Sequence, residues 1–316
     1  MLAKTMIKFI STLRLMRVLR YTLIACALTS VPASAGAADL HHHELRIAVA
    51  DENEQTKRVV EALQKKYPGA IVAADGAPVA NKRKKPIVIA VGPSALRNHL
   101  KKDADGPVIA VFTSSQTYRA ILDETSRTRA AGITAIYADP APSDQLRLIS
   151  LIYKRRVPIA VLLSDKTAHF AHQLNQAAAR SNIDLSIEHV APGDNVNRVL
   201  GRLGAVTAIL ALPDSVIYNS DSIRNILVTS YRSNQALIGF SASMVRAGAL
   251  ATTYASVDDI IAQLSEMLEE FDGSGKLPEA QFPRYFSVIV NDNVARSLDI
   301  VIDDSVRTLS RKPGAK

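Results

Sequence analysis

The sequence contains no tryptophan and a single cysteine, Cys26, among its 316 residues. A chain with one cysteine cannot carry a disulfide framework. Aromatic residues make up 5% of the sequence, glycine and proline number 14 each, and 47% of the residues are hydrophobic. These proportions exclude a disordered or collagen-like chain. A globular chain of this length normally forms about two domains of roughly 150 residues each.

The excess of positive charge is concentrated near the start of the sequence. The chain has 38 basic and 30 acidic residues, which gives a formal net charge of +8. Residues 1–37 hold no acid, and without them 33 basic residues face 30 acidic ones. The basic runs 82–85 and 154–156 lack interleaved aromatic residues. We interpret these runs as solvated loops, with a polyanion site as the alternative, and expect no nucleic-acid partner.

Residues 1–37 have the organisation of an export signal. Basic residues as far as Arg20 precede the apolar segment 21–31, and small residues at 33–35 or 35–37 form a signal-peptidase site. The apolar segment is shorter than the about 20 residues of a membrane span. We therefore expect a periplasmic protein whose cleavage removes Cys26. The alternative is a lipoprotein anchored at Cys26, since residues 23–26 fit a loose lipidation motif.

From residue 44 onward, short β-branched runs alternate with amphipathic segments of helix length. This alternation predicts parallel sheets with helices on both faces. A first series of strands is expected at residues 45–50, 70–74, 87–91, 108–112 and 133–137. A second series is expected at residues 159–163, 185–190, 206–212 and 236–240. The sequence thus predicts an α/β protein of two Rossmann-like lobes, joined first by the polar stretch 138–143.

Three later elements complete the two sheets: a strand at 249–254, an amphipathic helix at 257–271 and a strand at 286–290. Too few residues remain for a third domain, so the chain is expected to cross between the lobes more than once. The predicted division is a signal peptide at 1–37, a first lobe of 38–139 plus 249–281, and a second lobe of 140–248 plus 282–316.

Ligands of open parallel sheets bind beyond the carboxyl ends of the strands, where helix N-termini present free N–H groups. Small hydroxyl residues follow several expected strands at this position in both lobes. Such residues also cap helices, so capping alone is the alternative for each of them. The candidate ligand-binding residues are Ser94, Thr113, Ser114, Ser115, Ser164, Asp214, Ser215, Phe240, Ser241, Ser243 and Tyr254.

Asp214 is the sharpest of these candidates because it ends the apolar run 208–213. A carboxylate at a strand terminus suits an ammonium group or a hydroxyl, and a cap for the following segment is the alternative. Tyr218, Phe240 and Tyr254 are candidates for stacking on a ligand ring, although a single aromatic residue often belongs to a core.

Enzyme motifs are nearly absent. Residues 239–243 have the outline of a nucleophile elbow, but Ser243 occupies the place of its second glycine. No Gly-rich phosphate loop occurs in the sequence. His169 and His172 are three residues apart, but no acid or cysteine is placed to complete a metal shell. We therefore expect no catalysis, no cofactor and no metal.

A set of short motifs spans the second half of the sequence. The motifs lie at 211–214 (Ala-Leu-Pro-Asp), Asn219, 223–227, 231–232, 239–241, 245–251, 288–291 and 295–298. Together they resemble the ABC-transporter substrate-binding protein family related to tryptophan and tyrosine binders. The similarity covers most of residues 107–310 and is densest at 205–255.

The resemblance implies a type I periplasmic binding protein, in which two lobes joined by three crossing strands close on a small ligand. Asp214 and the Ser241 loop would belong to the second lobe's ligand wall, with the loop 113–115 opposite. Many relatives have Asp-Pro after the fourth strand where this chain has Ser115-Gln116. The resemblance therefore does not establish that the ligand is an amino acid.

The function expected from these features is capture of a small molecule, an amino acid or a related compound, for an ABC permease in the inner membrane. The first alternative is a periplasmic sensor that feeds a membrane receptor or signalling enzyme. The second is a secreted α/β hydrolase that uses Ser241.

Overall fold

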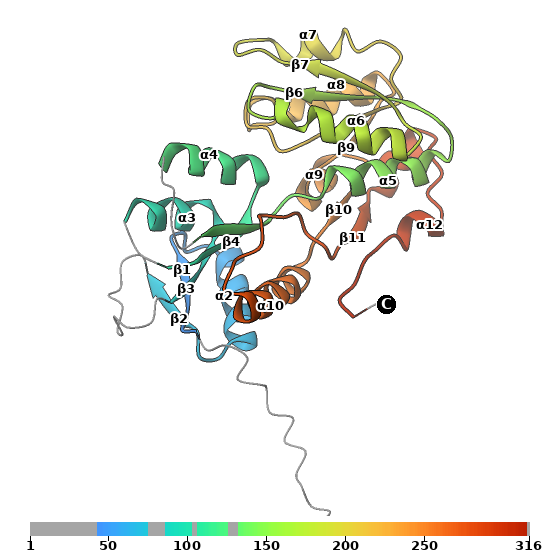
Figure 1. Ribbon diagram of the computed structural model, residues 1–316. Helices are drawn as coiled ribbons and strands as arrows, with labels where there is room; N and C mark the ends of the chain where they lie inside the picture. The colour runs from blue at the N-terminus through green and yellow to red at the C-terminus, as the bar shows by residue number, and fades with distance from the viewer. Residues whose placement is uncertain (1–42, 75–85, 103–105, 126–131, 315–316) are drawn as a thin grey trace, which may run out of the picture. The chain divides into compact units, whose positions relative to one another are not determined.

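The computed structural model describes residues 43–74, 86–102, 106–125 and 132–314. The expected export signal with Cys26 and the basic run 82–85 lie outside these residues. From His43 onward the chain forms one compact unit, built on two α/β sheets (Figure 1). Within the described ranges, the structure contains no helix with the length and apolar character needed to span a membrane.

The first sheet is parallel throughout and follows the expected first series of strands. Its strands are β1 (Leu45–Val49), β2 (Ile71–Ala74), β3 (Ile87–Val91), β4 (Val108–Thr113) and β5 (Ile133–Tyr137). Among the described residues their order is β2-β1-β3-β4-β5. Ile87 and Ile89 pack on one side of the sheet and Val88 and Ala90 on the other, because side chains alternate along a strand.

Helices cover both faces of the first sheet, as parallel sheets require. One face is covered by α2 (Glu54–Lys66) and α10 (Val257–Ser274), whose Leu63 and Leu264 are fully buried against it. The other face is covered by α3 (Gly92–Lys101) and α4 (Ser115–Thr125). The chain therefore returns to this sheet with α10, more than 100 residues after β5 has ended.

The second sheet is parallel except for its last strand. Its strands are β6 (Pro158–Leu163), β7 (Asp184–His189), β8 (Ala208–Leu210), β9 (Ala236–Ile238), β10 (Ala251–Tyr254) and β11 (Ser287–Val290). In the described part of the chain their order is β11-β10-β9-β8-β6-β7, with β11 antiparallel to β10.

The second sheet is also covered on both faces. On one face lie α5 (Pro142–Tyr153) and α6 (Ala171–Arg180), preceded by the 3₁₀ turn η1 (Ala168–Phe170), with the short helices α11 (Asp292–Ser297) and α12 (Asp304–Arg307). On the other lie α7 (Val196–Leu200), α8 (Ile223–Arg232) and α9 (Ala242–Ala247). Figure 1 shows these helices grouped around β6 to β11.

The two sheets share one topology, which locates the crevices where a ligand can bind. The order β7-β6-β8-β9-β10 repeats the order β2-β1-β3-β4-β5. In the first sheet the chain moves from β1 to β2 on one side and from β3 to β4 on the other side. In the second sheet it moves from β6 to β7 and from β8 to β9 in the same way. The connections therefore diverge between β1 and β3 and between β6 and β8. Open α/β sheets bind ligands at such switch points, beyond the carboxyl ends of the strands.

Strand β10 corrects one part of the expected division. The predicted division places residues 249–281 in the first lobe, but Ala251 of β10 pairs with Ile238 of β9 in the second sheet. The chain moves to the first sheet only after β10, where α10 begins. It passes Gln281, which bridges Ile136 of β5, and then returns to β11. The apolar pattern of a buried strand identifies the strand, but not the sheet whose edge it joins.

Candidate functional site

A pocket of about 170 Å³ lies at the switch point of the first sheet, beyond the carboxyl ends of β1, β3 and β4. Its apolar side chains are Val59, Val91 and Phe112. Its other lining residues are Asp51, Asn53, Gln55, Thr56, Gly92 and Pro93. The exposed carboxylate of Asp51 has no hydrogen-bond or ion-pair partner within the described residues. The pocket thus combines an apolar surface with one available negative charge.

Two unusual backbone conformations shape this pocket. Phe112 has φ +58°, a left-handed conformation that is uncommon for a bulky residue. The register between β4 and β5 shifts between Val111 and Thr113, so Phe112 is the bulged residue that leaves the ladder. Gly92, the first residue of α3, has φ +82°. Residues in such conformations persist where the surrounding structure holds them, and they cluster at binding sites.

Helix N-termini also meet at the pocket. Asn53 caps α2, since its side-chain oxygen accepts a hydrogen bond from the Thr56 N–H at 2.8 Å. Helix α3 begins at Gly92 without a side-chain cap. The free N–H groups and the positive end of α3 therefore lie beside the pocket.

Three of the predicted site residues lie where β4 ends and α4 begins. Thr113 is 1% exposed, and its hydroxyl has no hydrogen-bond partner in the described structure. Ser114 directly precedes α4: its hydroxyl accepts from the Thr117 N–H at 3.2 Å and donates to the Thr117 hydroxyl at 2.8 Å. Ser115 donates its N–H and its hydroxyl to Asp139, each at 2.6 Å. Ser114 and Ser115 therefore serve the protein's own loop in this structure.

Asp139 anchors this loop from the end of the neighbouring strand. It follows β5 and is 4% exposed. Burial raises the pKa of its carboxyl from the ordinary 3.8 to about 6, although the two hydrogen bonds from Ser115 oppose the shift. Asp139 also stands at the first crossing between the sheets, so one side chain connects that crossing with the loop after β4.

Asp214 makes a comparable anchor at the switch point of the second sheet. It is 2% exposed and follows β8. One carboxylate oxygen accepts from the Ser164 N–H at 3.1 Å, the Ser164 hydroxyl at 2.7 Å and the Thr167 hydroxyl at 2.5 Å. The other accepts from the Val216 N–H at 2.9 Å. The structure brings Ser164 and Asp214 together, and their hydrogen bonds occupy this second switch point.

Gln116 and Ser215 connect the two α/β units. Gln116 follows Ser115 in the first turn of α4, and its side-chain amide donates to the Ser215 hydroxyl at 3.3 Å. Ser215 is exposed and directly follows Asp214. The loops at the carboxyl ends of β4 and β8 therefore meet through this contact.

The remaining candidates lie on separate elements at the same edge of the sheets. Ser241 caps α9, accepting from the Met244 N–H at 3.3 Å, and its hydroxyl lies 2.9 Å from that of Ser243. Phe240 contacts Tyr218 edge to face at 5.9 Å between ring centroids. In the described chain no hydrogen bond joins Ser94 of α3 or Tyr254 of β10 to another candidate. No histidine or carboxylate within the described ranges hydrogen-bonds to Ser241.

The residues that form the pocket of the first sheet are not among the candidates predicted from the sequence. Asp51, Gln55, Thr56 and Phe112 line it, and none was a candidate. The polar run that follows the first expected strand was an available signal. Its significance depends on the strand order, because only a switch point between β1 and β3 places that run opposite Gly92. Asp139 was missed because its partner Ser115 is 24 residues away.

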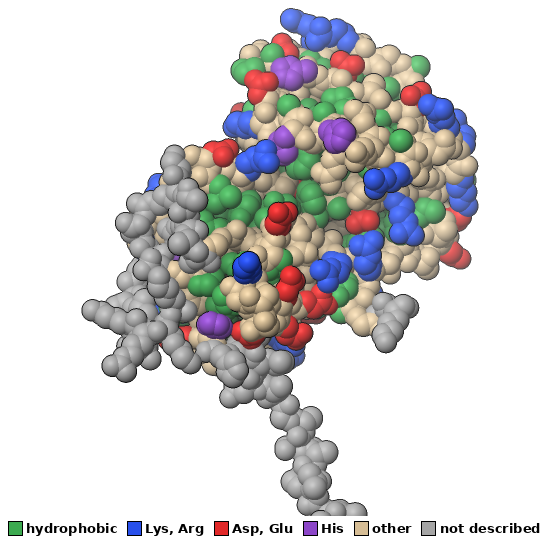
Figure 2. All heavy atoms as spheres, in the orientation of Figure 1, with side chains coloured by type: hydrophobic (Ala, Val, Ile, Leu, Met, Phe, Trp, Pro, Cys, Tyr) green, Lys and Arg blue, Asp and Glu red, His purple; other side chains and the backbone are tan. Residues whose placement is uncertain are grey.

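The described residues contain no cluster of three or more His, Cys, Asp or Glu side chains arranged to hold a metal ion. Of the two histidines singled out in the sequence, His172 hydrogen-bonds to Gln176. On the face that Figure 2 shows, basic side chains lie in separate groups with acidic ones between them.

Comparisons with solved structures give the same two-lobed arrangement. A substrate-binding protein with adhesive properties from Clostridium difficile, in a ligand-free, open form, is similar with TM-score 0.57 and 13% identity, over 84% of this chain and 96% of that chain. A conserved domain protein from Vibrio cholerae gives TM-score 0.55 and 15% identity, over 85% and 99%. An ABC domain from Streptococcus pneumoniae in complex with L-Trp gives TM-score 0.53 and 14% identity, over 84% and 97%.

No protein-family model and no curated protein matches the chain. TM-scores of 0.53–0.57 at 13–15% identity establish a shared fold and nothing beyond the fold. The two sheets with helices on both faces, which the sequence predicted, are present and are parallel except for β11. The chain therefore has the fold of type I periplasmic binding proteins.

Proposed function

We propose that this protein is an exported solute-binding protein that captures a small molecule between its two lobes and delivers it to an ABC permease. The observation that carries the proposal is the pocket at the switch point of the first sheet, lined by the strained Phe112. The hydrogen bond from Gln116 to Ser215 also supports the proposal, because it joins loops of both lobes near the carboxyl ends of their strands. The fold supports the proposal because proteins of this fold include substrate-binding proteins.

Capture requires a change of population between two arrangements of the lobes. A ligand that contacts both lobes at once binds the closed arrangement more tightly than the open one, and it shifts the equilibrium by that difference in affinity. The three crossings between the sheets are the segments that would bend. No bond is made or broken, so a ligand is released unchanged.

The ligand in this proposal is an amino acid or a related compound. The carboxylate of Asp51 is available for an ammonium group, and Val59, Val91 and Phe112 offer an apolar surface to a side chain. The uncapped start of α3 favours a negative group. The similar Streptococcus pneumoniae domain was solved with L-Trp, which supports testing this class first.

Isothermal titration with a panel of amino acids, small amides and organic acids tests the proposal. We expect saturable binding of at least one amino acid. In Phe112→Asn the affinity should fall at least about tenfold, because asparagine tolerates the left-handed backbone but lacks the ring. Asp51→Asn should weaken binding of ligands with an ammonium group, whereas the neighbouring Glu52→Gln should not. Saturable binding to none of the panel would reject the proposal.

Export and delivery need their own tests, because the segment that carries the expected signal lies outside the described residues. We propose a periplasmic location after cleavage near residue 35 or 37. N-terminal sequencing of protein recovered from a periplasmic fraction should start at residue 36 or 38. Retention in the membrane fraction that is lost in Cys26→Ser would instead establish the lipoprotein alternative.

A further inference from the structure

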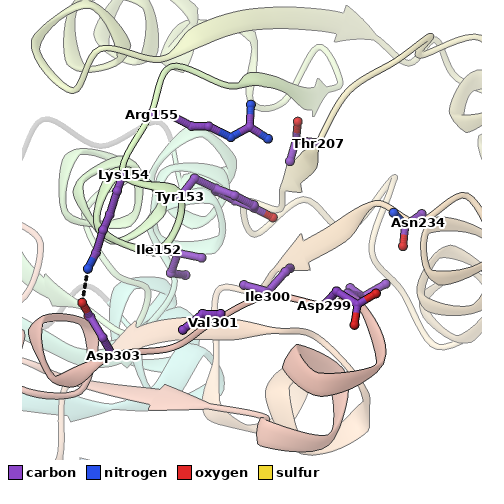
Figure 3. Close-up of a pocket in the computed structure, with 11 residues that line it drawn as sticks. Ile152, Tyr153, Lys154, Arg155, Thr207, Asn234, Asp299, Ile300, Val301 and Asp303 are labelled. Carbon is purple, nitrogen blue, oxygen red and sulfur yellow. Dashed lines mark hydrogen bonds and ion pairs between the residues drawn. The ribbon is translucent and has the colours of Figure 1, made fainter.

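A second cavity, of about 490 Å³, lies at the amino ends of the strands of the second sheet (Figure 3). Its lining residues Tyr153 and Arg155 precede β6, Thr207 precedes β8, and Asn234 precedes β9. Residues 298–301 and 303, which follow α11, complete it. Because the strands are parallel, this cavity lies at the edge opposite to Asp214. Its volume is within the range of small-molecule sites, and it takes no part in the proposed solute capture.

Three helices end at this cavity. Lys154 follows α5 with φ +52°, Asn234 lies two residues after α8 with φ +56°, and Asp299 lies two residues after α11 with φ +51°. A left-handed residue is the usual way to terminate a helix and turn the chain sharply. The negative ends of three helix dipoles therefore lie around one cavity, and they favour a positively charged group there.

The side chains of the cavity include one unpaired charge of each sign. Lys154 is paired with Asp303, whose pKa this hydrogen bond lowers to about 2. Arg155 and Asp299 have no ion-pair partner in the described part of the chain. Figure 3 shows Arg155 and Asp299 on opposite sides of Tyr153. Both side chains are exposed, so a ligand that carries one charge of each sign would pair with both.

Tyr153 provides a neutral hydrogen-bonding group between these charges. Its hydroxyl is buried and has no hydrogen-bond partner among the described residues. Burial raises its pKa to about 12, so the hydroxyl keeps its proton at ordinary pH. A buried polar atom without a partner is uncommon in native proteins, and a bound ligand is one explanation for it.

We propose that this cavity binds a small organic zwitterion. Its carboxylate lies at Arg155 and the Tyr153 hydroxyl, and its ammonium group lies at Asp299 near the ends of α8 and α11. Its hydrocarbon part packs on Ile152 and Ile300, which line the cavity between these groups. Such a ligand satisfies both unpaired charges and the unpartnered hydroxyl at once.

The probes are 4-aminobutanoate, 6-aminohexanoate and 8-aminooctanoate, with hexanoate and hexylamine as singly charged controls. Binding is followed by nitrogen–proton NMR of the full mature chain, because the amides of Asn234, Asp299 and Val301 report this cavity separately from the solute pocket. We expect saturable shifts at these amides with at least one ω-amino acid. The affinity of that probe should exceed that of both controls at least about tenfold.

Two pairs of substitutions complete the test. Arg155→Gln and Asp299→Asn should each weaken binding about tenfold, and Tyr153→Phe should weaken it less. The neighbouring Arg156→Gln and Asp304→Asn should bind as the parent does, since neither residue lines the cavity. Arg156 pairs with Asp184 at 3.8 Å, but both side chains are exposed, and the other four positions have no ion pair among the described residues, so thermal unfolding should be nearly unchanged. Absence of shifts at Asn234 and Asp299, or equal binding in Arg155→Gln and Arg156→Gln, overturns the proposal.

Discussion

At the scale of single residues, two buried aspartates hold the loops at the carboxyl ends of the sheets. Asp139 accepts two hydrogen bonds from Ser115, and Asp214 accepts four from three residues after β6 and β8. In each case a serine after one strand is held by an aspartate after an adjacent strand. The prediction that Asp214 binds a ligand directly stays a prediction. In this structure its carboxylate is hydrogen-bonded within the protein.

The raised pKa of Asp139 predicts a pH dependence of stability. The native pKa is about 6 and the ordinary value is 3.8, so the native protein binds more protons than the unfolded chain between about pH 4 and 6. The favourable contribution is complete below pH 4 and is lost as the pH rises through 6. The loss is on the order of 2–3 kcal/mol. Urea unfolding across pH 4–7.5 should therefore show a flatter profile for Asp139→Asn than for the parent. Parallel profiles would contradict the raised pKa.

Removing the Asp214 carboxylate should destabilise the protein strongly. Three of its four hydrogen bonds are buried and the fourth, from Val216, is partly buried, and unpaired buried donors are costly. We expect Asp214→Ala to lower the free energy of unfolding by about 3 kcal/mol, measured by urea denaturation. Asp165→Ala is the matched control, because this exposed residue pairs with His189 at the surface and should cost less than about 1 kcal/mol. Equal effects would show that Asp214 is not a structural anchor.

At the scale of elements, α10 depends on a defined start. Ser256 and Asp259 form a reciprocal capping box, in which Ser256 accepts from the Asp259 N–H at 3.1 Å and Asp259 accepts from the Ser256 N–H at 3.0 Å. The box stands where the chain crosses from β10 to the first sheet. Ser256→Ala should lower the free energy of unfolding by about 1 kcal/mol, and Ser256→Thr should preserve most of it. An unchanged denaturation midpoint in Ser256→Ala would contradict this role.

The turn between β9 and α9 requires a glycine for lack of space. A Cβ at Gly239 would lie 3.0 Å from the Met244 Cβ and 3.4 Å from the Ala249 Cβ. Gly239→Ala should therefore destabilise the protein by about 1–3 kcal/mol through overpacking. Gly69→Ala is the control, because a Cβ there meets nothing within 4 Å. Thermal unfolding of both variants tests the difference, and a neutral Gly239→Ala would show that α9 moves freely.

At the scale of the whole molecule, the Gln116–Ser215 contact predicts where the lobes can be linked. In a Cys26→Ser background, Gln116→Cys with Ser215→Cys should react with a short bismaleimide to give an intramolecular cross-link, because the native side chains are 3.3 Å apart. Gln116→Cys with Asn234→Cys is the control, since Asn234 lies at the opposite edge of the second sheet. Mass spectrometry of the products decides between the outcomes. Equal cross-linking of both pairs would contradict the contact.

The cross-linked protein also tests the proposed function. A ligand bound before cross-linking should exchange more slowly than in the unlinked protein, because release requires the lobes to separate. Exchange at an unchanged rate would mean that release does not depend on lobe separation.

The sequence by itself determined the elements and the fold class. Apolar periodicity placed β3 at 87–91 and β5 at 133–137, where the structure has them, because burial on both faces of a parallel sheet selects continuous β-branched runs. Such patterns are local, and so they predict where elements lie along the chain.

Tertiary structure alone decided what the elements do together. It assigned β10 to the second sheet and placed the switch point between β1 and β3. It made Phe112 a lining residue of the pocket there. It also paired Ser164 with Asp214 across 50 residues. These outcomes depend on the order in which strands pair and on contacts between distant residues, and neither leaves a periodic trace in the sequence.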